Sequence, residues 1–559
     1  MNKKNKGITS VVLLQSFTVF PEYFVGISTL YVLIVMVIIT HNVYGLMIQK
    51  SLSECLAFIM FMSCFLIYND DLMTQNFVSF HYSIINDYLS YISKFLVCFF
   101  SALYFLLIST SLKEQKLTSF EYLLIVLFAI LGLMLMCSSN DFLTAYLSLE
   151  LSSLAFYILA SFKKTSSYSV ESGLKYFITG AISSSFFLFG VSFIYVFSGS
   201  INFYDLFRLF GSLPTYPPYG EHAWKESYYT DWNYGERKYL ASVYRYMWYS
   251  YCIYLHPYDD PHWVRLNCTF NDIGLAFIGF SLFTKLAAAP FHLWSLDVYE
   301  GSPTSSTFFF ATISKFSIFI LLIRIFYITF NEELRAEHEW PHYFYFTGVF
   351  SIFVGSFGGL RQRKVKTLLA YSSITNVGYA LIALGTNSFV GVQMFFFHIV
   401  TYLISGFCTW SILSLLRLKT KKLTHKYSKE LGDLALLRKS NPALAFALSL
   451  TMFSIAGIPP MVGFLAKMGI FLSLVSFEVY LIVIPSAVFS VVSAFYYIRI
   501  VKIMYFENLL VGKLYKPITT NNTLILSLLI FSLLLLFINP NIIHIGSYLI
   551  LPLDNIIYR

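Results

Sequence analysis

Long apolar runs recur along almost the whole chain, and they constrain its fold more than any other feature. Each run is roughly 20 residues long, which is the length that a helix needs to cross about 30 Å of hydrocarbon. Charged residues make up only 12% of the sequence and hydrophobic residues 57%, whereas soluble domains are about 25% charged. The sequence therefore predicts an all-α polytopic membrane protein and excludes a soluble one.

The apolar runs predict about 14 transmembrane helices, seven in each half of the chain. The first seven lie near residues 21–40, 50–68, 88–110, 119–137, 142–161, 172–198 and 272–296. The second seven lie near residues 304–329, 343–360, 367–385, 389–416, 442–475, 478–505 and 521–538.

Basic residues gather in alternate loops, which indicates the orientation because Lys and Arg stay on the side from which insertion occurs. The positive loops carry Lys113, Lys116, Lys163, Lys164, Arg361, Arg363, Lys364, Lys366 and a basic run from Arg417 to Lys439. The opposite loops carry Asp70, Asp71, Asp141 and a cluster from Glu332 to Glu339. The net charge of +9 therefore follows from topology, and we expect no nucleic-acid partner.

Proline interrupts two of the predicted spans, the seventh and the twelfth. Lys285 precedes the break at Pro290, and Lys467 follows the break at Pro459-Pro460. Broken helices at comparable places in two halves are typical of internally repeated transporters. We pair spans four to eight with spans nine to thirteen as two repeats of five helices each. Because five is an odd number, the two repeats must be inverted relative to each other. The predicted units are three N-terminal helices (1–118), a first repeat (119–329), a second repeat (343–506) and a C-terminal helix with a tail (507–559).

Ionisable side chains inside predicted spans are candidates for function, because each one in hydrocarbon costs on the order of 3 kcal/mol or more. Four stand out, namely Glu150, Lys285, Lys315 and Lys467. Burial favours the neutral forms of carboxylates and ammonium groups, so such groups can exchange protons. His398 is a further candidate because the ordinary pKa of histidine is about 6.5. The sequence thus predicts a proton relay that needs no metal or cofactor.

Structural interpretations compete with the relay. Glu150 and Lys285 could form a simple salt bridge, and His398 could be a packing residue. Other basic residues lie closer to span ends, where a long side chain can reach the interface, and we expect no function for them. They are Lys94, Lys175, Arg324, Arg499 and Lys502.

The sequence lacks the motifs of bond-making chemistry. It has no GxxxxGK[ST] phosphate loop, no dinucleotide fingerprint, no CxxCH haem site, no HExxH and no cysteine cluster. The seven cysteines form no CxxC pair, which favours small packing residues over a metal framework. If the chain belongs to an enzyme, we expect it to be the transport part.

Several strings resemble the NADH dehydrogenase subunit 2 family, the antiporter-like membrane subunits of respiratory complex I. They are Pro21-Glu22, Leu147-Ser-Leu-Glu150-Leu-Ser-Ser, Glu171-Ser-Gly173-Leu-Lys-Tyr-Phe177, Phe291-His-Leu-Trp294-Ser-Leu-Asp297-Val-Tyr299-Glu300-Gly301-Ser-Pro303, Lys366-Thr-Leu-Leu-Ala370-Tyr-Ser372 and Ala456-Gly457-Ile-Pro-Pro460 with Gly463-Phe-Leu-Ala-Lys467. The resemblance covers roughly residues 20–210 and 271–510.

The resemblance implies a proton-translocating subunit of NADH:ubiquinone oxidoreductase. Glu150 matches the glutamate of span five, and Lys285, Lys315 and Lys467 match the lysines of spans seven, eight and twelve. NADH, FMN, iron–sulfur clusters and ubiquinone would act in other subunits, so this chain would hold no cofactor and perform no redox chemistry. Sister subunits often carry a lysine near Ser405, which is absent here. A multi-subunit cation/proton antiporter shares the fold and is the alternative, and a structural membrane scaffold is a third.

The same resemblance sets the expected partners and location. Neighbouring antiporter-like and other membrane-arm subunits, with lipids, would surround the chain. The abundance of Phe and Tyr would follow from an AT-rich organellar genome, so we expect the mitochondrial inner membrane rather than a bacterial plasma membrane. The positive loops would then face the matrix.

The polar segment 213–270 has no counterpart in the family. It holds twelve Tyr and four Trp, and such rings favour protein interfaces and lipid headgroups alike. We expect it to dock an accessory subunit on the outer face, with membrane-surface association as the alternative. His256 and His262 flank Asp259 and Asp260, but no cysteine supports a metal site there.

Overall fold

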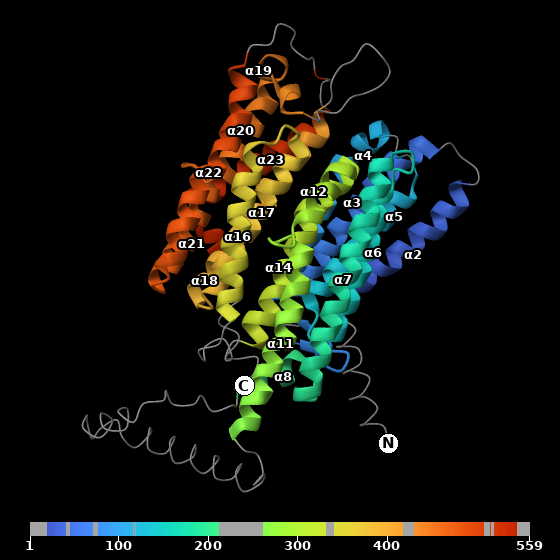
Figure 1. Cartoon of the computed structure of the whole chain (residues 1–559). Helices are drawn as coiled ribbons and strands as arrows, with labels where there is room; N and C mark the ends of the chain where they lie inside the picture. The colour runs from blue at the N-terminus through green and yellow to red at the C-terminus, as the bar shows by residue number, and fades with distance from the viewer. Residues whose placement is uncertain are drawn as a thin grey trace.

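The computed structural model is a bundle of long helices whose ends align at two opposite faces (Figure 1). It describes residues 19–40, 45–70, 77–115, 119–211, 261–330, 340–416, 430–435, 437–507 and 519–544, with the single residues 117 and 515. Within these ranges, 12 helices are long and apolar enough to cross a membrane. Each corresponds to one of the predicted spans, which confirms the all-α polytopic membrane class.

The helices of the first half occupy the following residues. They are α2 (Phe20–Thr40), α3 (Gly45–Asp70), α4 (Tyr88–Gln115), α5 (Glu121–Ser138), α6 (Phe142–Ser161), α7 (Ser167–Ser198), the short α8 (Phe203–Gly211), α11 (Pro261–Leu286) and α12 (Leu293–Gly301). Span eight is continuous, but α-helical and π-helical segments alternate along it. They are α13 (Thr304–Phe309), the π-helical η1 (Phe310–Ser314), α14 (Lys315–Leu322) and the π-helical η2 (Ile323–Thr329).

The second half has a similar order. It contains α16 (Trp340–Leu360), α17 (Val365–Gly385), α18 (Phe389–Leu415), the 3₁₀ turn η3 (Leu431–Leu434), α19 (Leu437–Ser440), α20 (Pro442–Ala456), α21 (Val462–Ser476), α22 (Tyr480–Tyr505) and α23 (Thr520–Ile538). The seventh predicted span is thus split into α11 and α12, and the twelfth into α20 and α21. The total of 14 spans, the inversion of the repeats and the domain boundaries stay predictions.

Two details differ from the sequence-based expectation. Strands β1 (Phe77–Ser79) and β2 (Ile84–Asn86) form a small antiparallel hairpin before α4. Helix α11 begins at Pro261, so the last part of the segment expected to be a loop, 213–270, is helical. Proline is tolerated in the first turn of a helix, where its missing N–H would have no partner.

Short polar side chains cap the first turns of several helices, because the first backbone N–H groups of a helix have no partner within the helix. Asp141 accepts from the Thr144 backbone N–H at 2.6 Å before α6, and Ser388 accepts from the Gly391 N–H at 2.9 Å before α18. Asn441 accepts from the Leu444 N–H at 3.3 Å before α20. These caps fix where the spans enter the bundle.

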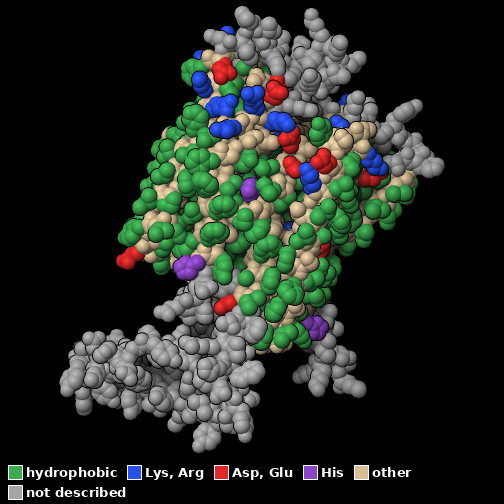
Figure 2. All heavy atoms as spheres, in the orientation of Figure 1, with side chains coloured by type: hydrophobic (Ala, Val, Ile, Leu, Met, Phe, Trp, Pro, Cys, Tyr) green, Lys and Arg blue, Asp and Glu red, His purple; other side chains and the backbone are tan. Residues whose placement is uncertain are grey.

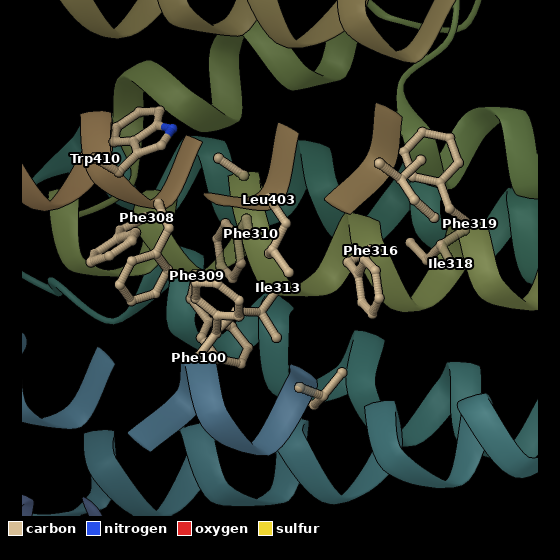
Figure 3. Packing of buried hydrophobic residues seen from close by; sticks show 14 of the residues in the cluster. Phe100, Phe308, Phe309, Phe310, Ile313, Phe316, Ile318, Phe319, Leu403 and Trp410 are labelled. Atoms are coloured by element: carbon tan, nitrogen blue, oxygen red, sulfur yellow. The ribbon is translucent and has the colours of Figure 1, made fainter. Parts of the chain in front are cut away.

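Span eight forms the centre of the bundle, and α17 packs beside it in the second half. All residues of the span after Thr304 are buried, and α14 packs against α4, α5, α11 and α18. Aromatic rings fill this core, and Phe308, Phe309 and Phe310 lie near the start of the span (Figure 3). The ring centre of Phe407 of α18 is 4.7 Å from that of Phe308. A charged side chain in this region is therefore enclosed by protein on all sides.

Charged side chains gather at one end of the bundle, whereas its flank is largely hydrophobic (Figure 2). Lys364 forms an ion pair with Glu300, and Lys366 donates to the Ser302 carbonyl at 2.7 Å. The Leu431 N–H donates to the Arg363 carbonyl at 2.9 Å. Two of the predicted positive loops, the one with Arg363 and the one that ends at Lys439, thus meet at one face.

Candidate functional site

Glu150 and Lys285 lie close together in the first half of the bundle. Glu150 is on α6 and Lys285 in the last turn of α11, and the Lys285 Nζ is 3.8 Å from the Glu150 Oε1. Neither of these two atoms has a hydrogen-bond partner among the described residues. The Glu150 side chain is 23% exposed and that of Lys285 is 6% exposed. The pair is therefore an ion pair without direct hydrogen bonding, and water can bridge it.

A cavity beside this pair reaches the next lysine. Lys285 and Lys315 both line it, together with the hydroxyl groups of Ser152, Ser153 and Ser314. Its size leaves room for about one or two water molecules. The structure thus brings Lys285 and Lys315 to one small cavity, and Glu150 is linked to it through its pairing with Lys285.

The break between α11 and α12 is held by side chains. The Trp294 indole N–H donates to the Thr284 carbonyl across the break at 2.9 Å, and its ring stacks on Tyr176 of α7 at 4.7 Å. The Ala289 N–H donates to the Ser351 hydroxyl at 2.8 Å. These bonds satisfy backbone groups that the interrupted helix leaves unpaired, as a membrane interior requires.

Lys315 lies at the junction between the π-helical turn η1 and α14. Its Nζ donates to the Ser373 hydroxyl of α17 at 3.0 Å and lies 5.8 Å from the Tyr299 ring centre. No carboxylate among the described residues is within ion-pair distance. Single π-helical turns are frequent at functional sites. The placement therefore fits a lysine that exchanges its proton with neutral neighbours.

Lys467 occupies the second broken helix. Its Nζ donates to the Ala456 carbonyl, the last residue of α20, at 2.8 Å, and lies 5.0 Å from the Tyr379 ring centre. Gly457 ends α20 with φ of 80°, and a Cβ at that position would lie 2.8 Å from the Lys467 Cδ. A glycine is therefore required both by the backbone and by the lysine.

His398 lies near Lys467 on the neighbouring helix α18. Its Nε2 is 3.2 Å from the Asn376 carbonyl, and its ring is 6.2 Å from that of Tyr379. The carbonyl can only accept, so Nε2 carries a proton. Its Nδ1 has no partner among the described residues. The geometry leaves Nδ1 available to accept a proton.

Helix α17 connects these groups. Ser373 contacts Lys315, Asn376 contacts His398, and the Tyr379 ring lies beside Lys467. These three residues are spaced three apart and therefore lie on one side of the helix. Side chains and one backbone carbonyl of α17 thus line the way from Lys315 to His398 and Lys467.

Sequence reasoning missed two buried ion pairs. Lys94 and Arg324 were expected to reach the interface, and this is wrong because their side chains are 2% and 1% exposed. Lys94 pairs with Glu22, and Arg324 pairs with Asp87. The sequence shows how far a residue lies from the end of a helix, but it does not show on which face of the helix its side chain lies. Lys502, in contrast, is exposed in the last turn of α22.

The described residues contain no group of three or more His, Cys, Asp or Glu that could hold a metal ion. His256, Asp259 and Asp260 lie outside the described residues, and only the backbone of His262 is described. A metal site in this segment therefore stays a hypothesis.

Comparison with known families identifies the bundle. The model of the membrane domain of NADH:quinone oxidoreductases and Mrp antiporters matches residues 139–229 and 262–493, which is more than half of the chain. The chain belongs to this family. The match includes all five candidate relay residues, confirms the resemblance of the strings around them and leaves residues 230–261 unmatched, inside the aromatic segment.

Curated relatives are similar over most of their length. NADH-ubiquinone oxidoreductase chain 2 of Marchantia polymorpha is 35% identical over 446 residues, which is 78% of this chain and 79% of the relative. NADH-quinone oxidoreductase subunit N of Paramagnetospirillum magneticum is 34% identical over 416 residues, or 74% of each. The chain is thus a multi-pass membrane subunit of the complex I type, and its relatives are both mitochondrial-type and bacterial.

Solved structures share the fold. A chain of respiratory complex I from Thermus thermophilus superposes with a TM-score of 0.68 at 23% identity, covering 94% of this chain and 98% of that one. A chain of the Mrp complex from Dietzia sp. superposes with a TM-score of 0.70 at 15% identity, covering 97% and 99%. At these identities the likeness shows the fold alone.

Proposed function

We propose that this chain translocates protons in the membrane arm of an NADH:ubiquinone oxidoreductase. One observation carries the proposal: Lys285, paired with Glu150, and Lys315 line the same small cavity. A carboxylate, two ammonium groups and room for water are the parts that a proton relay needs. Relatives with subunit N and chain 2 names support the assignment to the complex.

The Glu150 carboxylate controls the first step of the relay. While it is charged, it stabilises the Lys285 ammonium 3.8 Å away. When Glu150 takes up a proton, this stabilisation is lost and Lys285 releases its own proton. Water in the shared cavity passes that proton to Lys315, and side chains along α17 connect Lys315 to His398 and Lys467.

Redox chemistry belongs to other subunits in this proposal. NADH, FMN, iron–sulfur clusters and ubiquinone act there, and this chain holds none of them. The chain contacts neighbouring antiporter-like subunits and lies in the mitochondrial inner membrane. The positive end of the bundle faces the matrix.

A cation/proton antiporter subunit is the alternative, because the family model that matches this chain covers Mrp antiporters as well as NADH:quinone oxidoreductases. The two candidates differ in their ion and their energy source. Sodium-driven proton flux in vesicles that contain the chain without redox subunits would favour the antiporter, whereas flux that requires NADH and quinone favours complex I.

Proton pumping by the whole complex tests the relay. Lys285→Met and Glu150→Gln should each lower NADH-driven acidification several-fold in vesicles, and NADH:quinone activity should fall with it because redox and transport are coupled. Lys502→Met, at an exposed lysine, is the matched control and should leave both rates unchanged. An assembled Lys285→Met complex with full pumping would exclude this lysine from the relay.

Cysteine labelling tests the orientation. A cysteine in place of Lys422, which lies outside the described residues, should react only with reagents applied on the matrix side. Reaction with a membrane-impermeant reagent from the other side would overturn the topology.

A further inference from the structure

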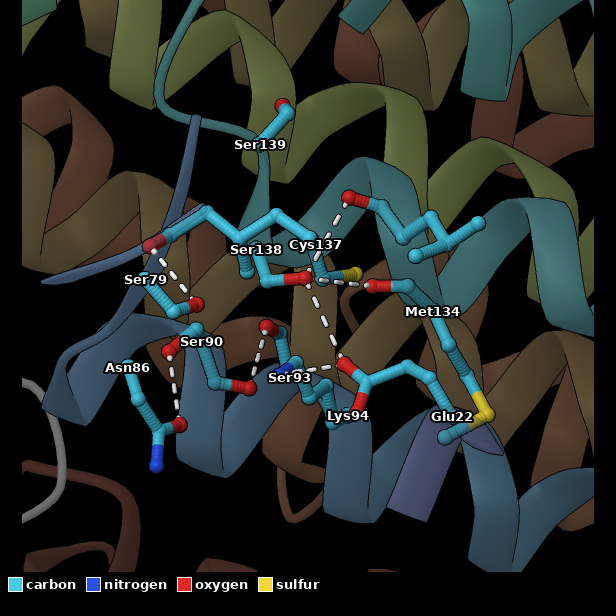
Figure 4. A network of polar contacts seen from close by, with 12 residues as sticks. Glu22, Ser79, Asn86, Ser90, Ser93, Lys94, Met134, Cys137, Ser138 and Ser139 are labelled. Carbon is cyan, nitrogen blue, oxygen red and sulfur yellow. Dashed lines mark hydrogen bonds and ion pairs between the residues drawn. The ribbon is translucent and has the colours of Figure 1, made fainter. Parts of the chain in front are cut away.

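Two buried ion pairs lie side by side in the N-terminal part of the bundle, outside the relay described above. Asp87 and Lys94 are both on or just before α4, two helical turns apart, and they pair with Arg324 and Glu22 respectively. Figure 4 shows the Glu22–Lys94 pair among serine side chains of α4 and α5. The two pairs contain the same kinds of charge but differ in how well they are satisfied.

The Asp87–Arg324 pair has the geometry of a structural link. Both carboxylate oxygens accept from the guanidinium at 3.0 Å, and one also accepts from the Ser90 N–H at 2.8 Å. The guanidinium also donates to the Cys137 carbonyl at 3.1 Å. A bidentate pair of this kind holds α4, α5 and η2 together and leaves the carboxylate fully bonded.

The Glu22–Lys94 pair is not satisfied in this way. The Glu22 Oε1 lies 2.5 Å from the Lys94 Nζ and accepts from the Ser138 hydroxyl at 3.4 Å. The other oxygen, Oε2, is buried and has no hydrogen-bond partner among the described residues. The two side chains are only 3% and 2% exposed. A buried carboxylate oxygen without a partner is costly unless it binds water or a proton.

Polar side chains of α4 and of Asn86 lie between this pair and the end of the bundle that carries the β1–β2 hairpin (Figure 4). The Ser90 hydroxyl donates to the Asn86 side-chain carbonyl at 3.4 Å, and the Ser93 hydroxyl donates to the Ser90 carbonyl at 3.1 Å. Asn86 is partly exposed. Lys94 is six residues after the start of α4, which is about 9 Å at 1.5 Å per residue. The pair is thus within the span but within reach of one aqueous side.

We propose that Glu22 and Lys94 form an additional proton-exchange site, reached from the hairpin end of the bundle. The resting pair is a carboxylate and an ammonium, with no net charge. Taking up a proton at the free Oε2 gives a carboxylic acid beside the ammonium, and releasing one gives a carboxylate beside a neutral amine. Each step moves one proton and changes the charge of the pair by one, so no other reactant is needed.

The position of α4 gives this site a route to the relay. Helix α4 packs against α13, η1 and α14, which form the span that carries Lys315. A change of charge at Lys94 therefore acts on the segment next to Lys315 through a medium of low polarity, where electrostatic effects are strong. This inference rests on the proposed pumping function, but not on the roles of Glu150 and Lys285.

Infrared difference spectroscopy and pumping assays on the whole complex test the site together. In the intact complex, a pH step should change a carboxylic acid C=O band that is lost in Glu22→Gln and shifted in Glu22→Asp. Glu22→Gln and Lys94→Met should lower NADH-driven proton pumping several-fold, and Glu22→Asp should retain most of it. A purely structural salt bridge would keep the carboxylate charged over the pH range in which the complex pumps, and no such band would change within that range.

Three comparisons make the outcome decisive. Asp87→Asn should reduce assembly but leave the Glu22 band in place. Lys285→Met tests the proposed function in parallel, so its loss of pumping with normal pumping in assembled Glu22→Gln would overturn this inference alone. If Glu22→Gln fails to assemble, the spectrum of Glu22→Asp decides, and an unshifted carboxyl band overturns the proposal.

Discussion

Each of the two broken helices accommodates a buried lysine, but the two lysines have different neighbours. Lys285 is in the last turn of α11 before its break, whereas Lys467 is in α21 after its break and reaches back to the final carbonyl of α20. In both cases the lysine is associated with the C-terminal end of a half-helix, where unpaired carbonyl groups favour a positive charge. The break thus supplies part of the environment that tolerates a buried ammonium.

The neighbours differ in whether they can change charge. Lys285 has the Glu150 carboxylate at 3.8 Å, while Lys467 has a backbone carbonyl at 2.8 Å and the Tyr379 ring. A carboxylate responds to protonation, but a backbone carbonyl does not. The comparison indicates that the ammonium at the first break is controlled by a directly paired carboxylate, whereas at the second break it is held by a backbone carbonyl, with His398 nearby as a group that can accept a proton.

Lys467→Met should have the largest effect on this comparison. Since no carboxylate among the described residues pairs with Lys467, and His398 only assists transfer there, we expect NADH-driven pumping to fall about tenfold, or about 1.4 kcal/mol. Pumping in vesicles measures this, with Lys502→Met as control. Pumping equal to that of the unsubstituted complex would show that the path ends before the second break.

Gly457→Ala should have the next largest effect, because it disturbs the second break while leaving Lys467 in the sequence. The left-handed backbone costs a residue other than glycine about 1 to 2 kcal/mol, and the new Cβ would meet the Lys467 side chain. We expect a lower melting temperature of the complex and a several-fold loss of pumping. Gly432→Ala is the matched control, since a Cβ there contacts nothing within 4 Å. Normal pumping in Gly457→Ala would mean that the contact with the Ala456 carbonyl is not required.

His398→Gln should have a smaller effect. Glutamine retains an N–H donor for the Asn376 carbonyl but has no ring nitrogen that can accept a proton. If His398 only assists transfer near Lys467, pumping should fall about twofold, or about 0.4 kcal/mol. An unchanged pumping rate, together with a lower melting temperature for His398→Ala, would assign the histidine to packing instead.

Deleting the aromatic segment should affect pumping least. A short Gly/Ser bridge in place of residues 216–258 leaves α11 and both breaks intact, so the pumping residues should stay competent. The complex should lose or bind more weakly one peripheral subunit, as a mass-spectrometric census of subunits would show. A complete set of subunits would contradict docking and favour association with the membrane surface.

The sequence by itself determined the spans, the two breaks and the candidate relay residues. Runs of about 20 apolar residues have few alternatives to membrane helices, and charges within them are rare enough to be noticed individually. Lys285 and Lys467 were found because each stands beside a proline break. The family strings then added the function.

Only the tertiary structure decided which charges meet. Asp87 and Arg324 are 237 positions apart, and their pairing depends on how α4 packs against η2. Lys94 was misjudged because sequence gives its depth of about two turns but not the direction in which its side chain points. The shared cavity of Lys285 and Lys315 likewise arises where α6, α11 and span eight converge. Hydropathy fixes what enters the membrane, whereas pairing among buried charges is set by packing between distant helices.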